Sequence, residues 1–300
     1  MMKVKVANAP CSWGVLEFES EREGATYTRV LDEMAKAGYC GTELGDWGFL
    51  PTDPDQLAAE LSRRKLSMLA AFVTVELSNK NAHEHGLEEV LKRARLLSRV
   101  SEAPFIVLAD AHGQNPNRTK KAGRIEKEDQ MTEQQWHAFT TGAERIAQAV
   151  LDQTGLKTIF HPHCAGFIET PAEVERFLSN TNPLLVGLCL DTGHYTFGGG
   201  DAVEGFRRQA DRIWQVEFKD CDSAIAARAK ANEWDYDESV RNGVFCELGK
   251  GSVDFPTLVK EMNEHNYSGW VMVQQDVLPG MGTPLESAIR NRQYLHSLGL

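Results

Sequence analysis

The sequence predicts a single (β/α)8 barrel, a closed ring of eight parallel strands surrounded by helices. Two observations carry this prediction: strand-length apolar runs alternate with helix-period segments from end to end, and polar residues follow nearly every run. The runs lack the polar alternation of a half-solvated sheet, as expected for parallel strands covered on both faces. A length of 300 residues suits one such domain, and we expect it to cover residues 1–300.

The expected strands span residues 4–7, 41–44, 67–75, 105–109, 158–161, 186–190, 213–218 and 270–273. The expected helices span residues 26–37, 54–64, 87–100, 133–151, 171–178, 202–210, 255–266 and 284–297. Asp53-Pro54 and Thr170-Pro171 each place a capping side chain before a proline at the first helical position. The alternative fold is an open doubly wound sheet, but residues 9–14 lack the GxGxxG turn that opens such a sheet.

Composition favours a soluble, cytoplasmic protein. The net charge of −11 opposes binding to nucleic acid or to anionic membrane surfaces. No apolar run approaches the roughly 18 residues that span a bilayer, and the N-terminus lacks the pattern of a signal peptide. The six cysteines are scattered without CxxC spacing, which indicates reduced thiols rather than a disulfide framework.

Two connections are longer than the others, at residues 110–131 and 221–251. Both follow a strand, and therefore lie on the face of the barrel where βα loops build active sites. We expect them to be lids or substrate walls. The first carries a basic run that forms either a solvated loop or a contact for an anion. This run consists of Arg118, Lys120, Lys121, Arg124 and Lys127.

Polar residues terminate almost every expected strand, and in a barrel such positions point into the mouth. They are Asn8, Glu43, Asp110, His112, His161, His163, Asp191, His194, Glu217, Lys219, Asp220, Gln274, Gln275 and Asp276. The chemistry is therefore expected at the carboxyl ends of the strands.

The clearest pattern lies at the ends of the fifth and sixth strands. His161 and His163 occupy alternate positions at the end of the fifth strand, so their side chains point to the same side of it. Asp191 and His194 follow at the end of the next strand. Imidazole and carboxylate groups from adjacent strands suit a divalent ion such as Mn, Co, Zn or Fe(II). The competing interpretation is a metal-free cluster that hydrogen-bonds a sugar.

Glu217 and Lys219 lie on one face of the seventh strand and are placed to form an ion pair. Such a pair would tune Lys219 as a proton donor or an electrostatic stabiliser, unless it is a salt bridge at the surface rim. Covalent catalysis is disfavoured, because Ser12 lies in no GxSxG elbow and nothing indicates that Cys164 is exposed.

These motifs resemble those of the xylose-isomerase-like barrels, which include sugar phosphate isomerases and epimerases and the inosose (2-keto-myo-inositol) dehydratases. The resemblance runs nearly end to end. It is carried by ANAPCSWG at 7–14, GTELG at 41–45, HPHCAGFIETP at 161–171, DTGH at 191–194, FKD at 218–220, ELGKG at 247–251 and QQD at 274–276. Barrels of this kind often pack against a partner copy, so a homodimer is an alternative to a monomer.

The resemblance implies one metal ion, held by ligands from strands five to eight that are commonly Glu, Asp, His and Glu. By position these are His161 (or Glu169 just beyond it), Asp191, Glu217 and Gln274. Only Asp191 matches the usual type, since His commonly stands at Glu217 and Glu at Gln274. The implied cofactor is Mn, Co, Mg or Zn, and the neutral Gln274 is a weaker ligand that cannot act as a base.

The resemblance also implies proton abstraction α to a carbonyl. Epimerases of this type use a carboxylate on each face of an enediolate, and Gln274 removes one of them. Dehydration of a keto-polyol needs a base, an acid and a cation that stabilises the enolate. The catalytic candidates are His163, His194, Lys219 and Glu43, and the candidates for substrate binding are Asn8, Trp13, Asp220 and Glu247.

We therefore expect a metal-dependent isomerase, epimerase or dehydratase (a lyase) that acts on a small keto-sugar or keto-inositol. The alternative is a non-catalytic sugar-binding barrel that has lost its metal. Phosphodiester cleavage, as in related endonuclease barrels, is disfavoured because it needs a basic face, which a net charge of −11 opposes.

Overall fold

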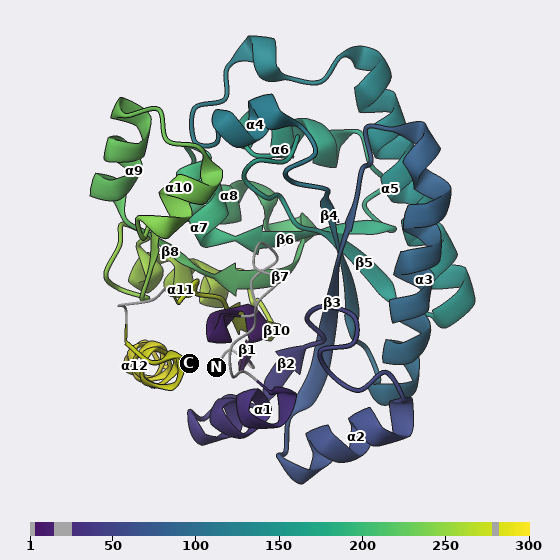
Figure 1. Cartoon of the computed structure of the whole chain (residues 1–300), viewed down its shortest axis with the longest axis vertical. Helices are drawn as coiled ribbons and strands as arrows, with labels where there is room; N and C mark the ends of the chain where they lie inside the picture. Colours follow the sequence, from purple (N-terminus) through teal and green to yellow (C-terminus); the bar gives the residue numbers. More distant parts are fainter. Residues whose placement is uncertain (1–3, 15–25, 278–281) are drawn as a thin grey trace.

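The computed structural model shows a closed barrel, as predicted, and the open-sheet alternative is wrong (Figure 1). The structure describes residues 4–14, 26–277 and 282–300. The ring order is β1-β10-β7-β6-β5-β4-β3-β2, with all pairs parallel, and pairing of Asn8 with Thr42 closes it between β1 and β2. The barrel strands are β1 (Val4–Asn8), β2 (Gly41–Glu43), β3 (Ser67–Val75), β4 (Phe105–Asp110), β5 (Lys157–Phe160), β6 (Val186–Asp191), β7 (Ile213–Phe218) and β10 (Gly269–Val273).

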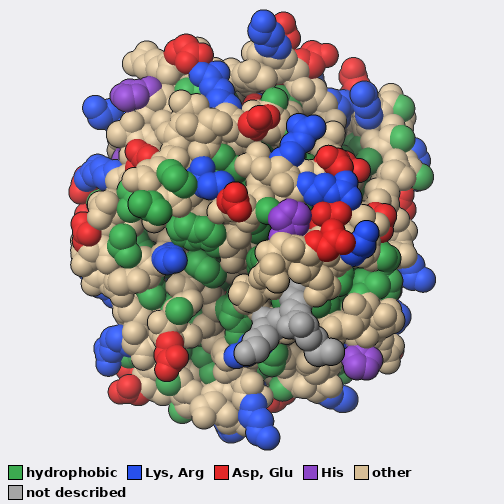
Figure 2. All heavy atoms as spheres, turned by 180° about the vertical axis from the view of Figure 1, so that it is seen from behind, with side chains coloured by type: hydrophobic (Ala, Val, Ile, Leu, Met, Phe, Trp, Pro, Cys, Tyr) green, Lys and Arg blue, Asp and Glu red, His purple; other side chains and the backbone are tan. Residues whose placement is uncertain are grey.

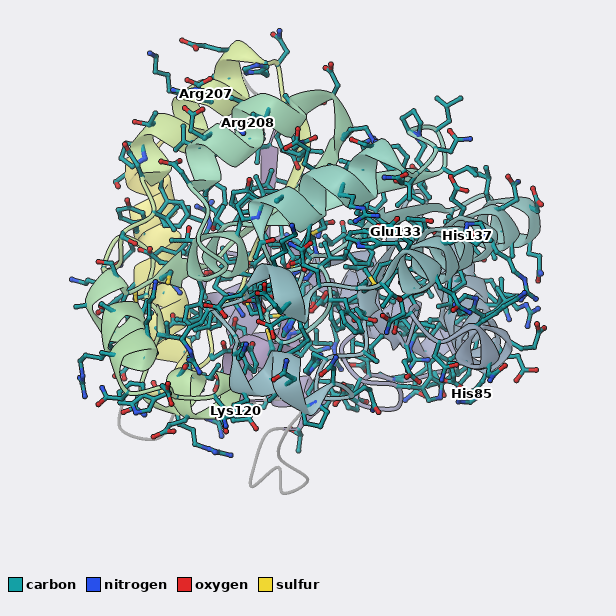
Figure 3. The ribbon with its side chains drawn as sticks, turned by 90° about the horizontal axis from the view of Figure 1, so that it is seen from above. His85, Lys120, Glu133, His137, Arg207 and Arg208 are labelled. Atoms are coloured by element: carbon teal, nitrogen blue, oxygen red, sulfur yellow. The ribbon has the colours of Figure 1, made fainter. Side chains whose placement is uncertain are left out.

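The expected helices surround this ring. They are α1 (Tyr27–Lys36), α2 (Pro54–Arg63), α3 (His83–Val100), α5 (Glu133–Thr154), α6 (Pro171–Ser179), α8 (Ala202–Gln209), α11 (Phe255–Glu264) and α12 (Pro284–Ser297). The side chains of Asp53 and Thr170 cap α2 and α6, as predicted. Figure 3 shows Arg207 of α8 at the outer edge of the molecule, and Glu133 at the start of α5 is exposed.

The two long connections contain secondary structure that the sequence did not reveal. The first holds α4 (Pro116–Lys120), and the second holds α9 (Ser223–Ala231), α10 (Tyr236–Arg241) and the antiparallel pair β8 (Asp220–Cys221) and β9 (Phe245–Cys246). The remaining short elements are α7 (Thr192–Phe197) and the 3-10 helices η1 (Pro10–Trp13), η2 (Lys80–Ala82), η3 (Lys127–Asp129) and η4 (Ala210–Arg212). Arg124 Nη1 donates to Trp234 O at 2.6 Å, so the two long connections contact each other.

The barrel interior is apolar toward the amino ends of the strands and carries ionisable side chains at their carboxyl ends. Ile159 and Cys189 belong to a buried apolar cluster, and two positions further along β5 and β6 stand His161 and Asp191. Because strand residues two apart share a face, each pair forms a column inside the barrel. Gly187 leaves room at the bottom for Trp214, whose ring lies 2.2 Å from where a Cβ would be. The packed floor therefore positions the polar groups at the mouth.

Lys and Arg side chains alternate with Asp and Glu over the face shown in Figure 2. All six cysteines are free thiols, as expected. Within the described ranges, every helix is too short or too polar to cross a membrane.

Candidate active site

Three buried ligand-type side chains converge where β5, β6 and β7 end. His161 follows β5, Asp191 is the last residue of β6, and Glu217 lies near the end of β7. One ligand atom of each lies within 4.8 Å of the other two. His161 Nε2 is 3.1 Å from Glu217 Oε2 and 3.7 Å from Asp191 Oδ2. The three side chains are at most 2% exposed, so they face one another away from bulk water.

The converging atoms of this cluster have no hydrogen-bond partner. They are Nε2 of His161, Oδ2 of Asp191 and Oε2 of Glu217, and Nδ1 of His161, on the other side of the ring, also lacks a partner. The other oxygens are engaged: Asp191 Oδ1 accepts from His194 N at 2.7 Å, and Glu217 Oε1 accepts from Gln215 Nε2 at 3.0 Å. Buried polar atoms in folded proteins are normally satisfied, so this set of oriented but unused atoms fits a cation.

The electrostatics of the cluster agree with this interpretation. Burial alone would lower the pKa of His161, but the carboxylates of Glu217 and Asp191 outweigh it and raise the pKa to about 10. The two carboxylates thus favour positive charge at the point where they meet the imidazole. A divalent ion would supply that charge with His161 neutral, and a donor set of one nitrogen and two carboxylates suits Mn, Co, Zn or Fe(II).

Glu169, the alternative to His161 as a metal ligand, forms hydrogen bonds away from the cluster. Its Oε1 accepts from Gly123 N at 2.7 Å and its Oε2 accepts from Ala165 N at 2.9 Å. The carboxylate therefore joins the two long loops that follow β4 and β5. His161 is the residue that lies in the cluster.

Lys219 pairs with a residue of β10's exit loop rather than with Glu217. Its Nζ lies 3.3 Å from Asp276 Oδ2, and both side chains are largely buried. The predicted pair of Glu217 and Lys219 is wrong, because Glu217 faces His161 instead. Burial would lower the pKa of Lys219, but the carboxylates of Asp276 and Asp191 raise it above its ordinary value. Lys219 is thus a permanent cation at the edge of the cluster.

The motif Asp191-Thr-Gly-His194 positions Lys219. Thr192 Oγ1 donates to Lys219 O at 2.6 Å and accepts from Lys219 N at 3.0 Å. The lysine side chain crosses Gly193, where a Cβ would stand 2.6 Å from Lys219 Cγ. Only glycine leaves room for this crossing, which explains the residue types at the end of β6.

Cys164 fixes the tautomers of two histidines. Its carbonyl lies 2.7 Å from His163 Nδ1 and can only accept, so Nδ1 carries the proton and Nε2 has a free lone pair. Its N–H donates to His194 Nδ1 at 3.3 Å, so the proton of His194 is on Nε2. Burial lowers the pKa of both rings, and both are neutral at pH 7. His163 lines the cavity, whereas His194 does not; its ring is tilted by 40° against that of His163, with ring centroids 4.0 Å apart.

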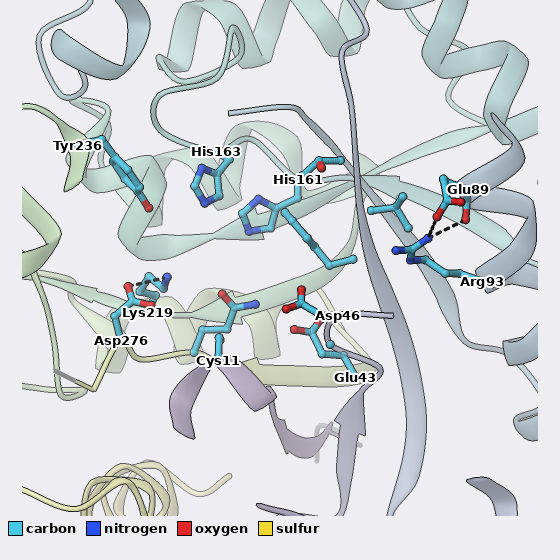
Figure 4. A pocket seen from close by; sticks show the side chains of 15 residues that line it. Cys11, Glu43, Asp46, Glu89, Arg93, His161, His163, Lys219, Tyr236 and Asp276 are labelled. Atoms are coloured by element: carbon cyan, nitrogen blue, oxygen red, sulfur yellow. Dashed lines mark hydrogen bonds and ion pairs between the residues drawn. The ribbon is translucent and has the colours of Figure 1, made fainter. Parts of the chain in front are cut away.

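The barrel mouth holds a cavity of about 220 Å³ (Figure 4), and Asp191, Glu217 and His194 are not among the residues that line it. Of the predicted residues, His161, His163, Lys219, Glu43 and Gln274 line it. Several residues for which we predicted no role also line it: Cys11, Asp46, Phe72, Thr74, Glu89, Arg93, Tyr236 and Asp276. Asp276 was identifiable as the next polar residue of its strand end, but nothing in the sequence pointed to Tyr236, which arrives from α10 in the long second connection.

Two candidates for substrate binding face the interior of the fold. Asn8 Oδ1 accepts from Ala9 N at 2.8 Å, and Asn8 is fully buried. Trp13 is 5% exposed and its Nε1 donates to Glu33 at 2.7 Å. Neither side chain is among those that line the cavity.

The other two candidates organise the connection after β7. The carboxylate of Asp220 accepts from the backbone N–H groups of Cys221, Gly249, Gly251 and Val253. Glu247 forms an ion pair with Arg290 of α12 and also accepts from Ser287. Neither carboxylate lines the cavity, and Asp220 explains Gly251 of the ELGKG segment, since a Cβ there would stand 2.4 Å from its Oδ1.

The basic run does not form a solvated loop throughout. Arg118 is fully buried and forms a bidentate ion pair with Glu173. Lys121 pairs with Asp129 at 2.9 Å, while Lys120 is exposed. The buried member of the run therefore holds loops together instead of meeting an anion.

Comparison with known proteins agrees with the fold. The family model described as xylose isomerase-like TIM barrel matches residues 31–294. An inosose dehydratase from Clostridium botulinum (strain Alaska E43 / Type E3) is 29% identical over 293 residues, covering 98% of this chain and 96% of that protein.

Two solved structures share the fold. The probable 3-DHS dehydratase AsbF from Bacillus anthracis superposes with a TM-score of 0.70 at 15% identity, covering 98% of this chain and 99% of the other. An IOLI protein with a bound zinc atom gives a TM-score of 0.70 at 15% identity and covers 98% of each chain. The family match spans most of the sequence, and the chain belongs to the xylose isomerase-like TIM barrel family.

Proposed function

We propose that this protein is a metal-dependent lyase of the inosose dehydratase type, which removes water from a keto-inositol or a related keto-sugar. The observation that carries the proposal is the cluster of His161, Asp191 and Glu217, whose buried ligand atoms converge without hydrogen bonds. Similarity to inosose dehydratases over nearly the whole chain supports the substrate class.

His161, Asp191 and Glu217 would hold the divalent ion, with the amide oxygen of Gln274 as a weaker fourth ligand. The zinc atom in the related IOLI structure supports a metal at this mouth. When bound, the ion would polarise the substrate carbonyl and stabilise the negative charge of the enolate. The convergence of otherwise unused atoms also favours this function over a sugar-binding barrel that has lost its metal.

His163 is proposed as the base. Its Nε2 has a free lone pair because Nδ1 donates to Cys164 O, and the ring lines the cavity. Nε2 takes the proton from the carbon next to the carbonyl, and the C–H electrons form the enolate. The enolate then expels the β-hydroxyl, and His163 returns the proton to it, so that one water leaves and the ring is neutral again. His194, whose tilted ring contacts that of His163, positions it.

Lys219 and Gln274 decide between dehydration and epimerisation in this proposal. Lys219, held by Asp276, stays protonated and donates to substrate oxygen as negative charge develops. The amide of Gln274 cannot take a proton, so it cannot serve as the second base that epimerisation requires. Glu43 and Asp46 line the cavity from β2 and its exit, and would accept hydrogen bonds from substrate hydroxyls.

The test is turnover of 2-keto-myo-inositol by the purified protein with Mn or Co added. The assay measures the dehydrated product, which has lost one water. We expect activity that a chelator removes and the metal restores. His163→Gln should lower kcat by about 10² to 10⁴-fold at unchanged metal content, because it removes the base. The control is His137→Gln, on the outside of α5 (Figure 3). Full activity of His163→Gln, or of the metal-free protein, would contradict the proposal.

A further inference from the structure

Gln215 lies in the barrel interior, one layer beneath the cluster of His161. It precedes Glu217 by two positions on β7, so the two side chains share the inner face of that strand. On the neighbouring β6, Cys189 pairs with Gln215 and Asp191 pairs with Glu217. Gln215 is fully buried, and Cys189 belongs to the apolar cluster that fills this part of the barrel. A buried amide therefore stands in an apolar floor, directly below the carboxylate of Glu217.

Only one of the two polar groups of this amide has a hydrogen-bond partner. Its Nε2 donates to Glu217 Oε1 at 3.0 Å and lies 3.8 Å from Cys189 Sγ, whereas its Oε1 is buried without a partner. Turning the amide by 180° would bring its oxygen against Glu217 Oε1, and an ionised carboxylate only accepts. A buried unsatisfied carbonyl destabilises a protein, and an apolar side chain of the same length would avoid it. The hydrogen bond to Glu217 is thus the contact for which an amide is suited here.

The hydrogen bond from Gln215 leaves Glu217 one oxygen for a metal ion. Oε1 is turned toward the floor, and Oε2 is the atom that lies 3.1 Å from His161 Nε2. Asp191 is restricted in the same way, because its Oδ1 accepts from His194 N at 2.7 Å and its Oδ2 faces the cluster. Each carboxylate therefore offers a single oxygen, and the cluster offers one nitrogen and two oxygens.

This donor set suits a transition ion better than Ca²⁺. Two atoms that each bind one ion at about 2.1 Å lie at most about 4.2 Å apart, and the separations of 3.1 and 3.7 Å in the cluster meet this condition. Imidazole with single carboxylate oxygens suits ions such as Co²⁺ and Zn²⁺. Ca²⁺ takes roughly six to eight oxygen ligands, often with a carboxylate bound through both of its oxygens. Fixing Glu217 through one oxygen thus disfavours Ca²⁺.

We propose that Gln215 is a positioning residue that makes the metal site selective: by holding Glu217 Oε1, it favours a transition ion such as Co²⁺ over Ca²⁺. This inference rests on the proposed function, which places an ion at the cluster, and adds the residue that selects it. Without the amide, Glu217 is free to turn and bind through both oxygens. This change weakens its orientation toward a small ion and creates the kind of ligand that Ca²⁺ prefers.

The test measures Kd for Co²⁺ and for Ca²⁺ by calorimetric titration of the metal-free protein. In the parent protein we expect Co²⁺ to bind more tightly than Ca²⁺. Gln215→Met keeps the length of the side chain and removes the hydrogen bond, and it should weaken Co²⁺ binding by about 10- to 100-fold. Ca²⁺ binding should not weaken with it, so the preference for Co²⁺ should fall by about tenfold or more.

The control is Thr158→Val. Thr158 is buried in β5 and its Oγ1 also lacks a hydrogen-bond partner, but it stands three positions before His161 and therefore faces the other side of the strand. The change removes a buried unsatisfied oxygen without touching the cluster, so both Kd values should stay as in the parent protein. Urea denaturation of the metal-free proteins measures whether each variant is folded.

The same preference for Co²⁺ in the parent and Gln215→Met proteins would overturn the role of Gln215 and leave the proposed metal site intact. Tighter binding of Ca²⁺ than of Co²⁺ by the parent protein would overturn the selectivity without any variant. An unfolded Gln215→Met protein would also overturn the inference, because the amide would then serve the fold. Absence of Co²⁺ binding to the parent protein would instead contradict the proposed function itself.

Discussion

Two buried polar groups near the barrel mouth use the same kinds of side chain in opposite ways. Around Arg118, Nε donates to Gly166 O at 2.8 Å, Nη2 donates to Phe167 O at 3.0 Å, and Glu173 accepts from both terminal nitrogens. Around His161, the converging atoms of the imidazole and of two carboxylates have no hydrogen bond. The first group is satisfied, and the second is not.

This difference distinguishes a group that stabilises the fold from a group that is available to bind a ligand. A buried charge costs free energy unless it is paired, so a completed network such as that of Arg118 stabilises one arrangement of the loops. Asp220, with four backbone N–H groups, belongs to the same class. The cluster of His161 lacks such partners, and its unused atoms are the ones that we propose hold a cation. Burial and charge alone do not distinguish the two groups, whereas the inventory of hydrogen bonds does.

The largest effect on stability is expected for Arg118→Met. This change leaves Glu173 buried without its partner, and we expect the free energy of unfolding to fall by about 3–5 kcal/mol in urea denaturation. Lys120→Met, at an exposed position of the same short helix, should change it by less than about 0.5 kcal/mol. A loss below about 1 kcal/mol for Arg118→Met would show that its network does not hold the loops.

A smaller, pH-dependent effect is expected for Glu169→Gln. Burial raises the pKa of Glu169 from 4.5 to about 7 in the folded protein, against the opposing effect of Arg118 and the N–H groups of Gly123 and Ala165. The folded state therefore holds this proton more tightly than the unfolded state. The residue's contribution to stability is full below about pH 4.5 and is lost as the pH rises through about 7.

The glutamine variant has no such titration. Its free energy of unfolding should lie furthest below that of the parent protein near pH 5, and the difference should shrink by pH 8. Chemical denaturation at the two pH values measures this change. A difference that is constant with pH would contradict a raised pKa at Glu169.

The fold was predictable from the sequence because apolar runs and amphipathic helices report burial directly. Each barrel strand and each large helix lies within a few residues of its expected position; β3 was expected at 67–75 and is Ser67–Val75. The short elements α4, α9 and α10 were missed, since helices of a few turns in polar loops have little periodicity. Their existence depends on packing, such as the burial of Tyr236.

The site was predictable in its types of residue but less so in its pairings. Strand ends placed His161, Asp191 and Glu217 at the mouth, and the structure brings them together. The partner of Lys219 was not predictable. Asp276 reaches Lys219 from the exit of the neighbouring strand β10, and the sequence alone does not reveal the register between β10 and β7.

The central claim is that His161, Asp191 and Glu217 form a cation site, and metal content tests it most directly. Asp191→Asn keeps the oxygen that accepts from His194 N and removes the negative charge from the cluster. Elemental analysis should find about one divalent transition metal per chain in the parent protein and less than about a tenth of that in the variant, with both proteins folded. Equal metal content in the two proteins, or none in the parent protein after growth and purification with Mn or Co, would contradict the account.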